Sequence, residues 1–253
     1  MKEFVFSCFS TKCVVKLEAS EYEASNLAIK CFELCKNLHL KYNYFDNSSL
    51  VSKINNKSKN RIKLDQQTMM ILQKLSSLSE ITNYAFDITL INKKLKNNAK
   101  YGKNSYFLSK KFIEFEDINT KIDLGGVIKE FAVDECAKIC EKYKYVINFG
   151  GDLKTNKEIF VNIKNPKNPK EAIKKWQILN QSLTTSAQYE RANHIVNTKD
   201  FKYSQVSVIG ESTFSCGVFS TALCFEEFVL PKEYLAICID FNNEIKYQSN
   251  RDR

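Results

Sequence analysis

Glycine is used sparingly and in pairs in this chain, and this usage constrains the fold more than any other feature. Of 7 glycines, four form two adjacent pairs, Gly125–Gly126 and Gly150–Gly151, which lie beside Asp123 and Asp152 respectively. Glycine permits tight turns and close backbone approach. Each pair therefore predicts a turn at which a ligand or another segment lies near the main chain.

A helical pattern follows the first pair. Apolar residues recur there at spacings of three and four: Ile128, Phe131, Ala132, Cys136, Ile139, Cys140 and Tyr143. This spacing predicts a helix that begins at the glycines and ends near Tyr143. Charged residues lie off the apolar stripe, on the predicted polar face: Glu130, Asp134, Glu135, Lys138 and Glu141. An apolar strand, 145–149, then leads to the second pair.

Strand and helix patterns alternate along the remainder without a linker-like stretch. Strands are predicted at 12–17, 112–117, 158–163, 182–186, 205–210, 234–241 and 243–248, and helices at 20–38, 65–82 and 216–228. Ser20 and Glu23 form a capping-box pattern, Asp65 is a predicted N-cap, and a polar segment, 41–60, separates the first two helices. This order predicts one mixed domain over residues 1–253.

The formal net charge of +9 favours a solvated basic surface. One run, 92–111, carries seven lysines among Tyr101, Tyr106 and Phe107, which is compatible with binding to a nucleic-acid backbone. The run lacks arginine and any nucleic-acid motif, so a solvated loop or hairpin is favoured. We do not expect a nucleic-acid partner.

The sequence contains no apolar run long enough for a membrane span and no signal-peptide pattern at its start, so we expect no membrane span and a cytoplasmic location. Nine cysteines fit a reducing compartment. Cys31 with Cys35, and Cys136 with Cys140, lie four apart in helical patterns, where thiols act as small hydrophobes. Zinc binding by these four is a weaker alternative because no CxxC spacing is present.

The first glycine pair is also a candidate anion site. A strand, a Gly-Gly turn and a helix N-terminus direct backbone N–H groups at an anion such as phosphate. Lys129 adds a positive charge, and Asp123 offers an acceptor. The spacing matches neither a dinucleotide-binding GxGxxG motif nor a phosphate-binding loop, so a purely structural turn fits equally well.

Several motifs in one order make the hypothesis more specific. They are STKCVVKL, YFDNSSLVSKIN, NYAFDIT, DLGGVIKEFAVD, VINFGGD, TTSAQYER, HIV and CGVFSTALC. From about residue 9 to 225 the chain resembles the ApbE family of FAD:protein FMN transferases. The resemblance implies an α+β fold with a single mixed-sheet domain. It also implies Mg²⁺-dependent transfer of FMN from FAD to a Ser or Thr of an acceptor flavoprotein, with release of AMP.

The resemblance also assigns roles to single residues. It implies FAD contacts for Asp123 and Lys129, a backbone oxygen ligand to Mg²⁺ from Gly126, and a magnesium contact from Thr221. The remaining implied flavin-pocket residues are Phe9, which replaces a usual methionine, Tyr44, Ala85, Phe86 and Asp87. His194 is expected near the reacting phosphate, both in FAD binding and as the catalytic base, and Thr185 and Ser186 match a T-S-G stretch.

Four departures from the family pattern bear on activity. The motif A-D-x-x-x-T reads CGVFST, so Gly217 stands where the metal-ligating aspartate is expected. The usual K-G after the glycine pair is Lys129–Glu130, T-S-G ends in Ala187, and H-I-I-D-P-x-T-G has become HIVNTKD. A hard cation prefers anionic oxygen. Either another carboxylate, such as Asp87 or Asp152, therefore provides the oxygen ligand for the ion, or activity is reduced.

Two hypotheses follow. In the first, the chain is an active flavin transferase; in the second, it is a catalytically impaired relative that binds flavin or assists flavoprotein assembly. Gly217 separates them, and restoring the carboxylate with Gly217→Asp is expected to tighten Mg²⁺ binding.

Overall fold

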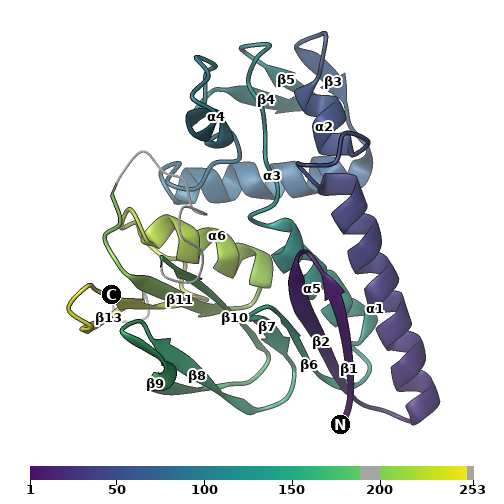
Figure 1. The fold of residues 1–253 in the computed structure, drawn as a ribbon, viewed down its shortest axis with the longest axis vertical. Helices are drawn as coiled ribbons and strands as arrows, with labels where there is room; N and C mark the ends of the chain where they lie inside the picture. Colours follow the sequence, from purple (N-terminus) through teal and green to yellow (C-terminus); the bar gives the residue numbers. More distant parts are fainter. Residues whose placement is uncertain (189–199, 250–253) are drawn as a thin grey trace.

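An eight-stranded antiparallel sheet forms the base of the molecule (Figure 1). The computed structural model describes residues 1–188 and 200–249. The strands, in sheet order, are β1 Lys2–Cys8, β2 Thr11–Glu18, β6 Lys144–Phe149, β7 Asp152–Thr155, β10 Gln181–Ala187, β11 Gln205–Gly210, β12 Leu235–Ile239 and β13 Ile245–Ser249. The second glycine pair, Gly150–Gly151, therefore lies near the centre of this sheet, because it joins the neighbouring strands β6 and β7.

Two smaller antiparallel sheets complete the β structure. One joins β3 Arg61–Lys63, β5 Phe112–Phe115 and β4 Tyr106–Ser109, and the other joins β8 Ile159–Asn165 and β9 Asn168–Ile178. Figure 1 shows the three-stranded sheet at the end of the molecule away from the large sheet, with α2, α3 and α4 beside it.

The described residues form six helices: α1 Glu21–Tyr42, α2 Leu50–Asn55, α3 Gln66–Ile81, α4 Ile91–Lys94, α5 Ile128–Ile139 and α6 Thr213–Leu223. The two predicted caps are confirmed. Ser20 and Glu23 make a reciprocal capping box on α1, and Asp65 Oδ1 accepts from the backbone of Thr68 on α3. None of these helices has the length and hydrophobicity needed to span a bilayer.

Helix α5 is the central helix of the α layer, in contact with α1 on one side and α6 on the other. On the α1 side, Cys31 Sγ lies 3.8 Å from Cys140 Sγ, and Cys35 Sγ lies 3.9 Å from Cys136 Sγ. All four residues are fully buried. These thiols thus pack as small hydrophobes between the helices, as their helical spacing predicted.

Several predicted boundaries were wrong. The predicted polar segment 41–60 contains α2, and α4 extends into the start of the basic run 92–111. The end of that run does form a hairpin, one of its two predicted forms, because β4 pairs with β5, and Lys100 in the run pairs with Glu116. Helix α5 ends at Ile139 rather than near Tyr143. The edge strand β1 and the long strand β9 were missed, although Phe4, Phe6 and Cys8 alternate as a strand requires.

The polar face of α5 was also misplaced. Glu130 and Asp134 were expected on a polar helix face, but the structure buries both, leaving 7% and 9% of their surface exposed. They face α6, a helix that is buried on nearly all sides. Periodicity separates apolar from polar positions, but it does not reveal that a polar stripe is itself an internal contact.

Candidate functional site

The first glycine pair forms a turn held by Asp123. Asp123 Oδ1 accepts a 2.8 Å hydrogen bond from Gly125 N, and Asp123 N donates to Ile88 O at 2.9 Å. Neither glycine has a left-handed φ. A Cβ at position 126 would lie 3.7 Å from the ring of Phe86, so this glycine keeps the backbone open beside an aromatic ring.

The A-F-D turn is anchored beneath this loop. Asp87 is buried and accepts hydrogen bonds from both the backbone N and the hydroxyl of Thr89, with 2.7 Å for the backbone bond. Burial raises the pKa of Asp87 and outweighs the lowering effect of the Thr89 hydrogen bonds. The Asp87 carboxyl group therefore stabilises its own turn and is poorly suited to a charged role.

Tyr44 and Phe9 present aromatic rings from two other loops. Burial, followed by the charge of Asp123, raises the pKa of Tyr44, so the phenol and this carboxylate are neighbours. Phe9 occupies the tip of the β1–β2 hairpin with a φ of 52°, and its ring meets His39 edge-on at 5.6 Å. A left-handed phenylalanine costs about 1–3 kcal/mol and is held in place only by its surroundings.

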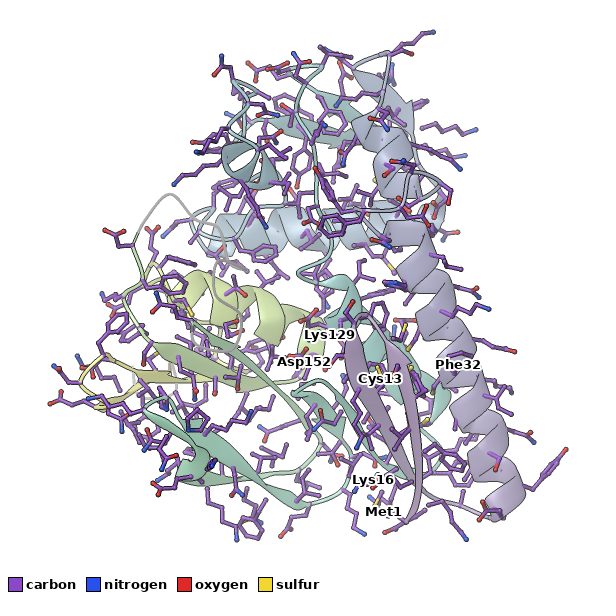
Figure 2. All side chains as sticks on the ribbon, in the orientation of Figure 1. Met1, Cys13, Lys16, Phe32, Lys129 and Asp152 are labelled. Carbon is purple, nitrogen blue, oxygen red and sulfur yellow. The ribbon has the colours of Figure 1, made fainter. Side chains whose placement is uncertain are left out.

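Lys129 joins the two glycine motifs. Its ammonium forms an ion pair with Asp152, the residue after the second pair, and lies 3.3 Å from Glu130 Oε1. Figure 2 shows Lys129 and Asp152 next to each other near the start of α5. Two carboxyl groups thus share one ammonium, all three largely buried.

Asp134, one turn after Glu130, caps α6. Its carboxylate accepts from Thr213 N and Phe214 N, both at 3.0 Å, from Ser212 Oγ at 2.7 Å, and from Lys154 Nζ at 2.7 Å. Burial acts to raise the pKa of Asp134, but the Lys154 charge and these hydrogen bonds outweigh it and leave the pKa below its ordinary value.

The α5–α6 contact brings predicted positions into register. Asp134 meets the first residues of α6, whereas a Cβ at Gly217, farther along α6, would lie 2.9 Å from Cγ of Glu130. The helices therefore run antiparallel where they touch. Four residues before Glu130, just ahead of α5, is Gly126, and four residues after Gly217 on α6 is Thr221. Because four residues make about one helical turn and the helices are antiparallel, these two positions lie at the same end of the contact.

Thr221 is linked to the T-S motif of β10. Its Oγ1 shares a 3.0 Å hydrogen bond with Ser186 Oγ, which also lies 2.9 Å from Ser220 Oγ. Thr185 bonds instead to Ser207 Oγ at 2.8 Å, so only Ser186 of the motif reaches α6.

The remaining predictions have different outcomes. His194 lies outside the described residues. Within 1–188 and 200–249, no three His, Cys, Asp or Glu side chains converge so as to hold a metal ion by themselves. A shallow hollow of about 500 Å³ lies elsewhere, at the start of β1 beside Leu17 and Glu18.

Glu130 was not predicted from the sequence as a site residue. The change from K-G to Lys129–Glu130 and the loss of the aspartate at Gly217 were both visible in the sequence.

A large antiparallel sheet, with α5 and α6 packed together and a glycine turn at the start of α5, defines a single-domain mixed α/β fold. A model of the ApbE family matches residues 9–238. The chain therefore belongs to the ApbE family.

Solved structures agree on the fold. The chain is similar to the ApbE protein of Thermotoga maritima, with a TM-score of 0.87, 19% identity, and coverage of 99% of this chain and 97% of that one. For the flavin transferase ApbE of Vibrio cholerae these values are 0.80, 15%, 98% and 97%. For the apo flavinyl transferase ApbE of Pseudomonas stutzeri they are 0.81, 15%, 99% and 96%. The predicted α+β fold is thus confirmed. No curated protein matched the chain.

Proposed function

We propose that this protein is a Mg²⁺-dependent FAD:protein FMN transferase that moves FMN from FAD to a Ser or Thr hydroxyl of an acceptor flavoprotein. One observation carries the proposal. In this ApbE-family chain, three features meet at the start of α5: the Gly125–Gly126 turn, the Phe86 ring and the Lys129–Asp152 ion pair. Two of the similar solved structures are named as flavin or flavinyl transferases, which supports the same reading.

The chain's residues divide into three proposed roles. Backbone N–H groups at the start of α5 bind the pyrophosphate, with Asp123 and Lys129 on either side of the nucleotide. The rings of Phe9, Tyr44 and Phe86 hold the isoalloxazine, together with Ala85, and Asp87 fixes the turn that carries Phe86. In this role Lys129 exchanges part of its contact with Asp152 for phosphate.

The oxygen groups at the α5–α6 contact fit a hard divalent cation. Among the described residues, no hydrogen bond is made to the Gly126 carbonyl, while the neighbouring Leu124 and Val127 carbonyls accept from the helix. Thr221 offers a hydroxyl, and Glu130 Oε2 is buried without a hydrogen-bond partner in the described part of the chain. Magnesium sites commonly combine one or two carboxylates with substrate phosphates. When bound, the ion neutralises charge on the pyrophosphate.

The transfer itself needs positioning and one proton acceptor. The acceptor hydroxyl oxygen forms a bond to the FMN phosphorus, the bond from that phosphorus to the bridging oxygen breaks, and AMP leaves. We assign the removal of the hydroxyl proton to His194, on the sequence resemblance alone. Imidazole is suited to this because its ordinary pKa lies near neutrality.

Incubation with FAD, MgCl₂ and an acceptor flavoprotein domain tests the proposal. We expect release of AMP together with an increase in acceptor mass equal to one FMN group, and no reaction when EDTA replaces MgCl₂. FAD binding without AMP release over a wide range of Mg²⁺ concentrations would contradict it. That outcome favours the second candidate, a catalytically impaired flavin-binding or assembly protein, for which the missing carboxylate at Gly217 is the specific observation.

A further inference from the structure

The space beside Gly217 is occupied by a side chain from the neighbouring helix. A Cβ at position 217 would lie 2.9 Å from Cγ and 3.4 Å from Cδ of Glu130. Real Cβ atoms do not approach that closely, so Glu130 and a side chain at 217 exclude each other without a rearrangement. The two departures from the family pattern, glutamate at 130 and glycine at 217, are therefore sterically coupled.

The Glu130 carboxylate is also incompletely satisfied. Oε1 lies 3.3 Å from Lys129 Nζ, an ammonium already paired with Asp152. Oε2 is buried and has no hydrogen-bond partner among the described residues, and only 9% of the side chain is exposed. A buried carboxylate oxygen without a partner is unfavourable, so such a group is retained where a ligand completes it.

The other acidic side chains nearby are already engaged. Asp87 accepts two hydrogen bonds from Thr89, Asp152 is ion-paired with Lys129, and Asp134 accepts four hydrogen bonds at the start of α6. Asp152 Oδ2 is also buried without a hydrogen bond among the described residues, but it is the oxygen that pairs with Lys129. Glu130 Oε2 has neither a hydrogen bond nor an ion pair there, and Glu130 lies opposite Gly217, one helical turn from Gly126 and Thr221.

We propose that Glu130 has replaced the missing aspartate of α6: the carboxylate ligand for the divalent cation comes from α5, into the space that Gly217 leaves open. This inference rests on the proposed function for the identity of the ion. The sequence raised the question of which carboxylate replaces the aspartate expected at position 217, with Asp87 and Asp152 as candidates; this inference assigns the role to Glu130 instead. It also explains why glycine, rather than another small residue, occupies position 217. It also reverses the expectation for Gly217→Asp, which in the presence of Glu130 introduces a clash rather than a better site.

Binding of Mn²⁺, measured by the loss of its free electron paramagnetic resonance signal, tests this without turnover. Titrations are made with FAD and without acceptor, on the wild type, Glu130→Gln and Glu135→Gln. Glutamine keeps the size of the side chain and removes the anionic oxygen. Glu135 is the matched control because it lies on the same helix and pairs with Lys138 near the surface.

We expect Glu130→Gln to weaken Mn²⁺ binding at least tenfold and Glu135→Gln to change it less than twofold. Circular dichroism melting of all three proteins checks that the fold is retained, and if Glu130→Gln is unfolded, Glu130→Asp serves instead, with a smaller loss expected. A wild type that does not bind Mn²⁺, or equal affinities for wild type and Glu130→Gln, would overturn the inference.

The two proposals fail in different ways. FMN transfer with unaltered Mn²⁺ affinity in Glu130→Gln removes the inference and leaves the proposed function. Conversely, Glu130→Gln can lose Mn²⁺ binding while the wild type never releases AMP. That result supports the cation site and contradicts the proposed transferase activity.

Discussion

Two carboxylates on helix α5, one turn apart, have opposite surroundings. Asp134 accepts hydrogen bonds from two backbone amides, a serine hydroxyl and Lys154, and it joins the start of α6 to the sheet. Glu130 is equally buried, yet one of its oxygens has no partner in the described residues. The two carboxylates therefore share the same degree of burial but differ in their partners, and the proposed role of Glu130 as a cation ligand rests on that difference.

The largest effect is expected at Asp134. Asp134→Ala leaves Lys154 and the first amides of α6 without a buried partner, and the loss of one partner of a buried pair costs about 3–5 kcal/mol. Urea unfolding measures this. Glu135→Ala is the control, because this partly buried side chain pairs with the exposed Lys138, and we expect a change of about 0.5 kcal/mol or less. A loss below about 1 kcal/mol for Asp134→Ala would erase the contrast with Glu130.

The charge of Asp134 also predicts a pH dependence. Its pKa is lowered in the folded protein, with burial opposed by Lys154 and the hydrogen bonds. The stabilisation is therefore fully present above the unfolded pKa of about 3.9 and is lost as pH falls through the folded pKa. The stability difference between wild type and Asp134→Asn, from unfolding at a series of pH values, should shrink below about pH 4. A difference that stays constant with pH would show that Asp134 stabilises the fold through its hydrogen bonds and not through its charge.

A smaller effect, with a change of sign, is expected at Gly217. Gly217→Ala places a methyl group against Glu130, and overpacking of about 1–3 kcal/mol exceeds the gain of about 1 kcal/mol from replacing a helical glycine. In a Glu130→Ala background the same change should stabilise by up to about 1 kcal/mol. A double-mutant cycle by urea unfolding measures the coupling. Equal effects in both backgrounds would refute steric exclusion.

The smallest effect on stability is expected for Glu130→Gln. It removes a charge that lacks a full set of partners, so the free energy of unfolding should change by less than about 1 kcal/mol or increase. Calorimetric melting without metal measures it, with Asp134→Asn as the contrasting variant. A loss comparable to that of Asp134→Asn would make Glu130 a structural residue.

The sequence allowed the α+β class, the helix after the first glycine pair and the caps at Ser20 and Asp65 to be predicted, because each depends on local spacing and local hydrogen bonds. The two glycine pairs look alike in sequence but differ in structure. Gly150 and Gly151 have φ of 63° and 105°, and a Cβ at Gly150 would lie 2.3 Å from Thr11 Oγ1. Gly125 and Gly126 have no such φ, and a Cβ there would lie 3.1 Å from Asp123 Oδ1 and 3.7 Å from the Phe86 ring respectively.

The part of the site that could not be predicted depends on contacts between helices. Glu130 and Asp134 occupy polar positions of α5, and only the packing of α6 turns that stripe into a buried contact. The signal for Glu130 was present as two separate departures from the family pattern, at positions 130 and 217. Linking them requires the antiparallel register of α5 and α6, which no motif in the sequence encodes.

The exchange of these two residues tests the central claim most directly. Mn²⁺ affinity, measured by electron paramagnetic resonance with FAD, is compared among wild type, Glu130→Gly, Gly217→Asp and the double variant. If the carboxylate has changed helices, Glu130→Gly binds Mn²⁺ at least tenfold more weakly than the wild type, a loss of about 1.4 kcal/mol or more. The double variant then recovers the affinity to within about threefold of wild type. A double variant as weak as Glu130→Gly, or a Glu130→Gly variant that binds like the wild type, would contradict the account.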